Sequence, residues 1–430
     1  MKATRLALVL MAAAALVFAF AGAAFAFHDG GVAFCEGCHT MHNSLGGVSN
    51  SVSGWGSPGV THNQYLLKGT DPSSTCLNCH SHSGASYQVL STDGSAYTPG
   101  GDFYWLSQTY TYSPWSGNTS TSQGQNHGHT VVAADFALST STILTVAPGA
   151  GTQPVYYASN LACNSCHNPH GRVNGGTRNG QAPVMGSGSY GNTAPSGTIL
   201  GNYRLLADTY YAPGDPTVYD PAPSGIAGYP QAFTYIANAP IAVAPNVGHS
   251  AASMHEVEGL GTTGIEHTDY GSGVAEWCGN CHQGFVNNAA DGTSTTHRHP
   301  AGDTATLGAT IAGFYNEYVS TGNIHGTSAN AYLPLVPFER GAGATLSASS
   351  TAGPDGVKSA VMCLSCHRAH ATAFDEMTRW DTSADFISAS SALIATAKPW
   401  AANAPYYGWD IVANMGSYQR SLCNKCHIQD

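Results

Sequence analysis

The sequence predicts a chain that is mostly coil, with a few short helices and minimal β structure, wrapped around a core that its side chains do not supply. Gly (51) and Pro (22) are abundant and charged residues make up only 9% of the 430 residues, a composition typical of loops. Disorder is not expected, because the chain holds 22 Tyr, 13 Phe and 7 Trp, and disordered chains are poor in aromatic residues. All 12 cysteines recur in one short motif, which indicates what the missing core is.

The first 26 residues have the pattern of a secretory signal peptide. Lys2 and Arg5 precede an apolar run that ends at the small-residue site Ala24-Phe25-Ala26. We expect a signal peptide over residues 1–26 and one continuous body over residues 27–430. An uncleaved anchoring helix is the alternative, but the apolar run is short for a membrane span. No later stretch is long and apolar enough for one, so we expect no span in the mature chain.

The charge balance argues against a nucleic-acid partner. Lys and Arg number 14 against 25 Asp and Glu, which gives a formal net charge of −11. Binding of DNA or RNA needs a basic surface that neutralises phosphates, and this chain has no such excess of positive charge.

Every cysteine belongs to one of six copies of Cys-x-x-Cys-His. The cysteines are Cys35, Cys38, Cys76, Cys79, Cys163, Cys166, Cys278, Cys281, Cys363, Cys366, Cys423 and Cys426. The adjoining histidines are His39, His80, His167, His282, His367 and His427. In this motif two thiols attach to haem as thioethers and the histidine becomes the proximal iron ligand. The sequence therefore predicts a multihaem cytochrome c with six haem c groups.

Two other uses of paired cysteines explain the pattern less well. Disulfides are usual in secreted chains with an even cysteine count, but they give no reason for a histidine after every second cysteine. Zinc ribbons also use paired cysteines, yet they do not demand the trailing histidine.

Further histidines are available to bind the opposite side of each iron. Twenty histidines less the six proximal ones leave fourteen, so ligation of every iron by two histidines is possible. Four histidines follow the proximal histidine of a motif by two or three residues: His42, His82, His170 and His370. A histidine at this distance lies on the wrong side of its own haem to bind that iron, so it must reach a neighbouring haem. A second group lies beside Gly or Pro in turns: His28, His129 and His299. His127 and the remaining histidines lack such settings, and the methionines are interpreted as packing residues.

Regular structure is expected in only a few places. The apolar spacing predicts a helix over residues 303–318, with Asp303 as its cap and Gly322 beyond its end. Shorter helices are expected over residues 374–380 and leading into Cys423. The β-branched run at 130–146 favours short strands.

Blocks of sequence from end to end resemble a known family. They include Cys35-Glu-Gly-Cys-His-Thr-Met-His42, Arg298-His299-Pro300-Ala-Gly, Cys363-Leu-Ser-Cys-His-Arg-Ala-His370 and Tyr418-Gln-Arg-Ser-Leu-Cys423. These blocks resemble the outer-surface hexahaem cytochromes that metal-reducing bacteria polymerise into conductive filaments. The long spacers at residues 83–162 and 171–277 match least well.

The resemblance implies haems with two histidine ligands, stacked in one continuous array, and subunits joined head to tail. It also implies that His42 crosses the subunit boundary to bind a haem of the next subunit, which we expect to be the haem held by His367. The predicted function is extracellular electron transfer at the cell's outer surface, to acceptors such as metal oxides or other cytochromes. A monomeric periplasmic shuttle is the alternative. A multihaem reductase fits less well, because such an enzyme needs an open iron position and the candidate ligands exceed the need.

Overall fold

The computed structural model describes a little under half of the chain. The described residues are 35–40, 44–45, 48–49, 66–82, 88–96, 98, 100–112, 120–150, 155–169, 203–207, 211, 213, 233, 235–243, 259–261, 264–266, 268–286, 299–321, 336–346, 353–380, 382 and 422–427.

Most of the described residues are coil, and the helices are short. The α-helices are α2 (Cys35–Cys38), α3 (Pro72–His80), α4 (Cys163–Cys166), α5 (Val274–Cys278), α6 (Gln283–Val286), α7 (Gly308–Thr321), α8 (Cys363–Cys366) and α11 (Leu422–Cys426). The 3₁₀ turns are η1 (Phe103–Ser107), η2 (Gly124–Asn126), η3 (Ala134–Phe136), η4 (Ala158–Asn160), η6 (Tyr203–Leu205) and η9 (Asp375–Met377). The predicted coil architecture is confirmed.

The strands form antiparallel pairs, and no larger sheet occurs among the described residues. The pairs are β1 (Ser44–Leu45) with β2 (Val48–Ser49), β3 (Tyr110–Tyr112) with β4 (Ser120–Ser122), β5 (Ile241–Val243) with β8 (Asp269–Ser272), and β6 (Gly259–Gly261) with β7 (Gly264–Glu266). In β5 and β8 the register shifts between Ile241 and Ala242.

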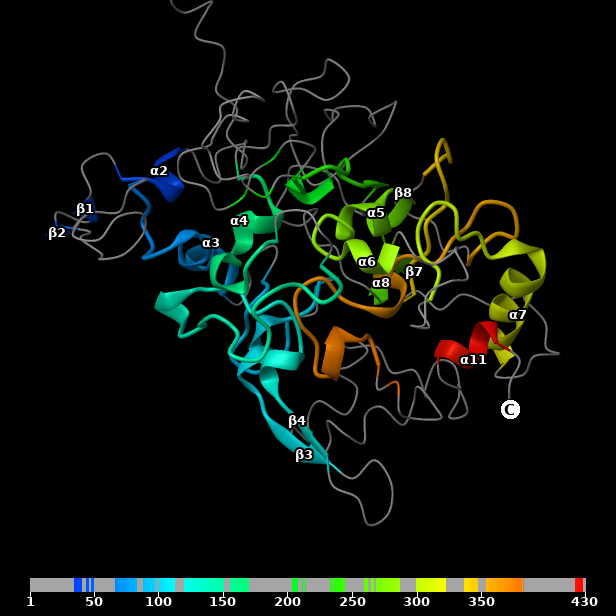
Figure 1. Ribbon diagram of the computed structural model, residues 1–430, viewed down its shortest axis with the longest axis horizontal. Coiled ribbons are helices and arrows are strands. Elements are labelled where there is room, and N and C mark those ends of the chain that lie inside the picture. Colours follow the sequence, from blue (N-terminus) through cyan, green and yellow to red (C-terminus); the bar gives the residue numbers. More distant parts are fainter. Residues whose placement is uncertain are drawn as a thin grey trace, which may run out of the picture.

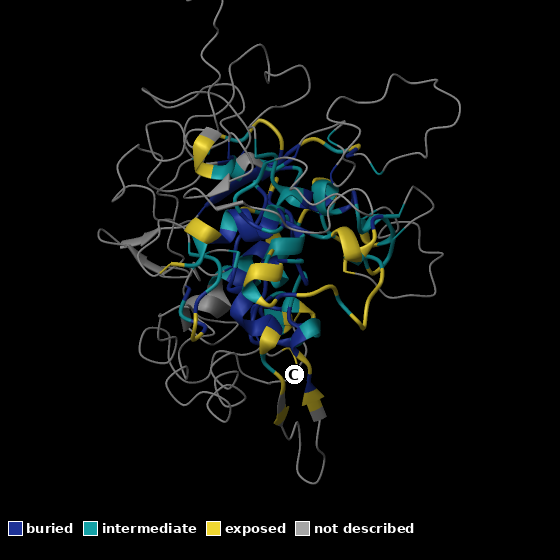
Figure 2. Ribbon diagram, turned by 90° about the vertical axis from the view of Figure 1, so that its left-hand side faces the viewer, coloured by how far each residue is buried: buried dark blue, intermediate teal, exposed yellow. Residues whose placement is uncertain are grey.

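The helices that carry the cysteine motifs follow one another across the molecule. Figure 1 shows α2, α3 and α4 toward one end of the long axis, α5 and α8 near the middle, and α11 toward the other end. α3 packs against α4, α5 against α8, and α11 against α7. Figure 2 shows buried segments concentrated along the middle of the molecule.

Among the described residues, two apolar clusters lie between these helices. The larger is built on η1, whose Phe103, Tyr104, Trp105 and Leu106 pack with Leu77 of α3 and with the segment after α8. The smaller joins Tyr203, Tyr270, Val274 and Met362. Each cluster is small for a chain of this length, as expected if polypeptide is only part of the core.

The helix expected over residues 303–318 begins later than predicted. Asp303 does not cap it, because the first helical residue is Gly308, and the Asp303 amide N–H instead donates to Glu276 Oε1 at 3.1 Å. The Leu307 amide donates to the Ser359 carbonyl at 2.9 Å, which also holds this segment out of the helix. α7 therefore begins at Gly308, and it ends at Thr321, beside the predicted end.

The expected helix over 374–380 is reduced to the turn η9, because Glu376 and Met377 have positive φ angles of 60° and 49°. The strands expected over 130–146 were wrong. That segment forms η3 and isolated bridges, since Val132 pairs with the remote Leu161 rather than with a neighbouring strand. The residues before Leu422, where a helix leading into Cys423 was expected, lie outside the described part of the chain, and α11 covers the motif itself.

Asp102 organises the loop before η1. Its side chain is 1% exposed and accepts hydrogen bonds from Ser91 N, Ser91 Oγ, Ala96 N and Tyr104 N. Burial raises the pKa of the carboxyl, while these hydrogen bonds oppose the rise. The carboxylate thus closes the 91–102 loop and caps η1 at the same time.

We predict that Asp102→Ala lowers the free energy of unfolding by about 2–4 kcal/mol, because several buried donors lose their acceptor. Guanidinium unfolding of the haem-loaded protein, followed by circular dichroism, measures the change. Asp93→Ala is the matched control, since Asp93 is exposed and its carboxylate accepts from Ser95 within the same loop. Equal effects of the two substitutions would contradict this role for Asp102.

Candidate haem sites

Each cysteine motif lies on a helical turn that gathers its three reactive side chains. His167 N–H donates to the Cys163 carbonyl at 3.0 Å, and the same bond is present in the motifs that end at His282, His367 and His427. Residues three and four apart share a helix face, so the turn places two thiols and one imidazole together. The turns explain how a spacing of two residues produces one binding unit.

The thiols of successive motifs lie near one another. The Cys76 thiol lies beside that of Cys163, and the Cys278 thiol lies beside that of Cys363. Cys281 lies close enough to Cys166 to interact with it electrostatically. Similar contacts join Cys38 to Cys76 and Cys366 to Cys423. The eleven cysteines with described side chains are all free thiols, and they stand in for the thioether sulfurs of attached haem. The motifs therefore follow each other in space in the order of the sequence.

Five of the candidate histidines present the same ring nitrogen to the protein. In each case Nδ1–H donates to a backbone carbonyl at 2.7–2.8 Å, which leaves Nε2 as the atom with a lone pair. The residues are His129, His167, His282, His299 and His367. Metal-binding histidines characteristically donate their second N–H in this way.

Three pairs of histidine rings lie opposite each other at nearly equal separations. The ring centroids are 6.1 Å apart for His129 and His282, 6.3 Å for His167 and His370, and 6.2 Å for His299 and His427. A metal ion bound by two imidazoles at about 2 Å each separates their centroids by roughly 6 Å. Each pair joins a proximal histidine to one of the candidates from the second side. The residues therefore fit a haem iron held between two histidines.

In two of the pairs, His129 with His282 and His167 with His370, the pKa of each ring is lowered, which favours the neutral form that binds metal. Burial, with the neighbouring His167 and His129, lowers the pKa of His370 to about 3. Burial and the neighbouring His129 lower the pKa of His282 to about 4. His129 and His167 shift in the same direction, mainly through burial.

A backbone clamp positions His129 and His370. We use this name for the contact of residues 100–101 and 128–129 with residues 370–371. His370 N–H donates to the Gly100 carbonyl at 2.7 Å, and His129 N–H donates to the His370 carbonyl at 2.9 Å. A Cβ on Gly101, whose φ is +92°, would lie 2.0 Å from the Ala371 oxygen. The His370 ring stacks on Phe103 at 4.8 Å, while its Nδ1 faces the glycine backbone without a well-formed hydrogen bond.

The remaining predicted ligands have different placements. His39 and His80 are partly buried on their motif turns, and His82 is exposed. In the described part of the chain, no second imidazole lies opposite His367. His28, His42 and His170 lie outside the described residues.

His127, which the sequence does not single out, is a core residue. It is fully buried, with Nδ1 donating to the Trp105 carbonyl at 2.9 Å and Nε2 bonded to Ser122 Oγ at 2.5 Å.

Sequence reasoning missed the clamp, although Pro99-Gly100 is a turn signal that marks the place. It also missed the carboxylate group of Glu276, Asp303 and Glu339, which no motif indicates.

Comparisons with known proteins show similarity to OmcS cytochromes. The C-type cytochrome OmcS of Geobacter sulfurreducens is 40% identical over 464 aligned residues, which cover 99% of this chain and 97% of the relative. No protein-family model matches. The cryo-EM structure of the OmcS nanowires is similar with a TM-score of 0.71 and 36% identity, and the Outer Membrane Cytochrome S filament with 0.68 and 38%. Both matches cover 94% of this chain and 100% of the solved chain. Among the described residues, no helix is long and apolar enough to cross a membrane.

We predict that Gly101→Ala lowers the free energy of unfolding by about 3 kcal/mol or more, because the new Cβ meets the Ala371 carbonyl as well as an unfavourable φ. Gly343→Ala is the control, since Gly343 has φ +74° but no atom within 4 Å of the added Cβ. It should cost about 1 kcal/mol. Denaturant midpoints compare the two, and equal losses would show that the clamp does not need the close approach.

Proposed function

The chain belongs to the family of the c-type cytochrome OmcS, and we propose that it carries electrons to acceptors outside the cell through six covalently attached haems. The observation that supports this most directly is the set of three histidine pairs, each about 6 Å between ring centroids. Bound haem supplies an iron that takes up and releases single electrons. Two protein ligands on an iron leave no position for a substrate, which favours electron transfer over reductase activity.

The residue pairs suggest which histidine serves which haem. His129 pairs with His282 of the fourth motif, His370 with His167 of the third, and His299 with His427 of the sixth. Each second ligand comes from a distant segment. The candidates for the other three irons are His28, His42, His82 and His170. The contacts between successive thiols support electron passage in the order of the motifs.

We propose that the chain is exported by a signal peptide over residues 1–26 and that residues 27–430 polymerise head to tail. The solved relatives are filaments, which supports this assembly. A head-to-tail contact joins two different surfaces and propagates as an open filament when its rotation does not close. We assign His42 to the iron of His367 in the next subunit, since within the described residues that iron position has no second histidine.

His129→Ala tests the assignment of the fourth haem. The iron held by His282 should lose its second ligand, so one haem in six should become high-spin in the electron paramagnetic resonance spectrum. His127→Gln is the control, because this neighbouring histidine binds only protein atoms. It should leave every haem low-spin. An unchanged spectrum for His129→Ala would refute the pairing.

His42→Ala tests the assembly. We expect the variant to attach six haems but to remain monomeric, with one haem per subunit high-spin or weakly ligated. Electron microscopy and size-exclusion chromatography measure assembly, and absorption spectra count haems. His62→Ala, a histidine outside the candidate set, should form normal filaments. Normal filaments from His42→Ala would reject this role.

A further inference from the structure

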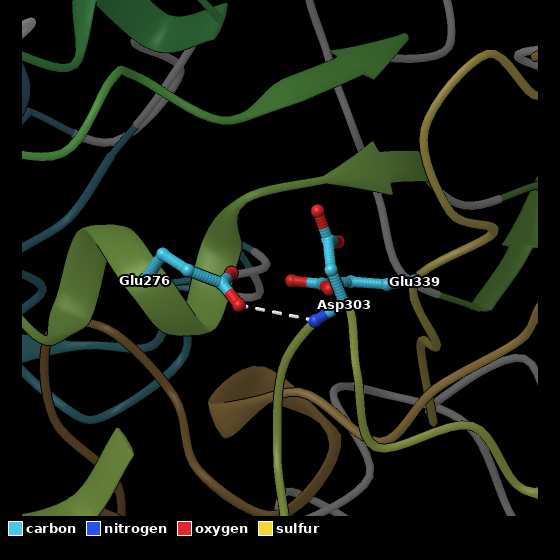
Figure 3. A group of neighbouring side chains, drawn as sticks. All are labelled: Glu276, Asp303 and Glu339. Atoms are coloured by element: carbon cyan, nitrogen blue, oxygen red, sulfur yellow. Dashed lines mark hydrogen bonds between the residues drawn. The ribbon is translucent and has the colours of Figure 1, made fainter. Parts of the chain in front are cut away.

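Three carboxylates from separate segments converge beside the fourth motif. Figure 3 shows Glu276, on α5, pointing toward Asp303 and Glu339, with a hydrogen bond from the Asp303 amide to Glu276. One oxygen from each residue lies within 4.8 Å of the other two. Gly302, with φ +98°, admits the Glu276 carboxylate, since a Cβ there would lie 2.4 Å from Oε1.

Only one of the two carboxylate oxygens of Glu339 has a hydrogen-bond partner. The side chain is 0% exposed, and its Oε1 accepts hydrogen bonds from Val274 N at 2.8 Å and Ala275 N at 3.2 Å. Its Oε2 is buried without a hydrogen-bond partner, and so is Oε2 of Glu276. A buried oxygen without a partner destabilises the fold, because it has lost its hydrogen bonds to water and makes none to the protein. Both oxygens belong to residues of this group of three carboxylates.

The charges around Glu339 have the wrong sign to stabilise it. Burial, contact with Asp303 and the charge of Glu276 raise its pKa to about 9. The charged groups that act on it are thus both acidic. Either a proton or a cation must offset this crowding of negative charge.

We propose that Glu276, Asp303 and Glu339 bind one Ca²⁺ ion. Carboxylate oxygens are the ligands of hard divalent cations, and Ca²⁺ takes 6–8 oxygens at about 2.4 Å, so that two of its ligands lie up to about 4.8 Å apart. The three oxygens lie within that span. Mg²⁺ holds its ligands at about 2.1 Å in a strict octahedron, which suits this spread less well. Asp303 is exposed and opens the site to solvent, from which the ion enters and water completes its coordination.

The ion would join the segments that carry three haem sites. Glu276 lies two residues before Cys278 of the fourth motif. Asp303 follows His299, which faces His427 of the sixth motif. The Glu339 backbone pairs with Ala360, at 3.0 and 2.9 Å, just before the fifth motif. Ca²⁺ therefore acts as a structural tie between the last three haem sites, independent of whether the chain forms filaments.

The test uses the haem-loaded full chain, stripped of divalent ions with chelator and titrated with CaCl₂ or MgCl₂ by calorimetry. We expect one Ca²⁺ per chain, confirmed by elemental analysis, and at least tenfold weaker binding of Mg²⁺. Hydrogen exchange should slow at the Asp303 amide when Ca²⁺ is added, because the ion fixes the Glu276 carboxylate that accepts this N–H.

Asp303→Asn should weaken Ca²⁺ binding at least tenfold with little effect on folding, since the residue is exposed. Glu339→Gln keeps the oxygen that accepts from Val274 and Ala275, and it should abolish binding. Glu36→Gln, an exposed carboxylate in the first motif, is the control and should bind as the parent does. Absence of a one-to-one Ca²⁺ isotherm in the parent would overturn the proposal and leave a shared proton as the explanation. Unchanged binding by Asp303→Asn would place the ion elsewhere and equally overturn it.

Discussion

The hydrogen bond from the motif histidine to the first cysteine, present in the third to sixth motifs, is the constraint on which the rest of the structure depends. It closes one helical turn, and that turn puts both thiols and the imidazole on one face. Nothing longer is needed, which explains why α2, α4 and α8 are only four residues long. Isolated helices of this length are unstable in water, so the turns must be held by what they bind and by their neighbours. Ser165 shows one such support, because its hydroxyl accepts from the Ala162 amide and bonds Tyr156.

The second side of each site is built differently, from coil rather than helix. His129 and His370 are placed by backbone contacts of glycines, and His299 by a bond to the carbonyl of the next residue. Coil suits this purpose because an imidazole that must approach from outside its own motif needs a backbone free of helical geometry. The abundance of glycine is thus a requirement of the sites, and Gly101 and Gly128 show it directly, since a Cβ at either would overlap backbone atoms of residues 370–371.

Features written in consecutive residues could be predicted from the sequence, whereas features that depend on contacts between distant segments could not. The motifs, the coil architecture and the family followed from spacing and from blocks such as that around Cys35, because each is written in consecutive residues. The helix start at Asp303 was wrong because the Leu307 amide bonds to the Ser359 carbonyl, and the strands over 130–146 were wrong because Val132 pairs with Leu161. Neither partner can be read from local pattern. The carboxylate group escaped notice for the same reason, since its three members lie far apart in the sequence.

The proposed ligand pairs also explain how a chain with small apolar clusters holds one shape. Each iron would close a long loop, from 129 to 282, from 167 to 370 and from 299 to 427. A cross-link that closes a long loop removes more freedom from the unfolded chain than one that closes a short loop. These loops overlap, because 167 lies inside the first and 299 inside the second. Losing one ligand therefore loosens segments that the next iron also holds, and the haem sites should stabilise the fold together rather than one by one.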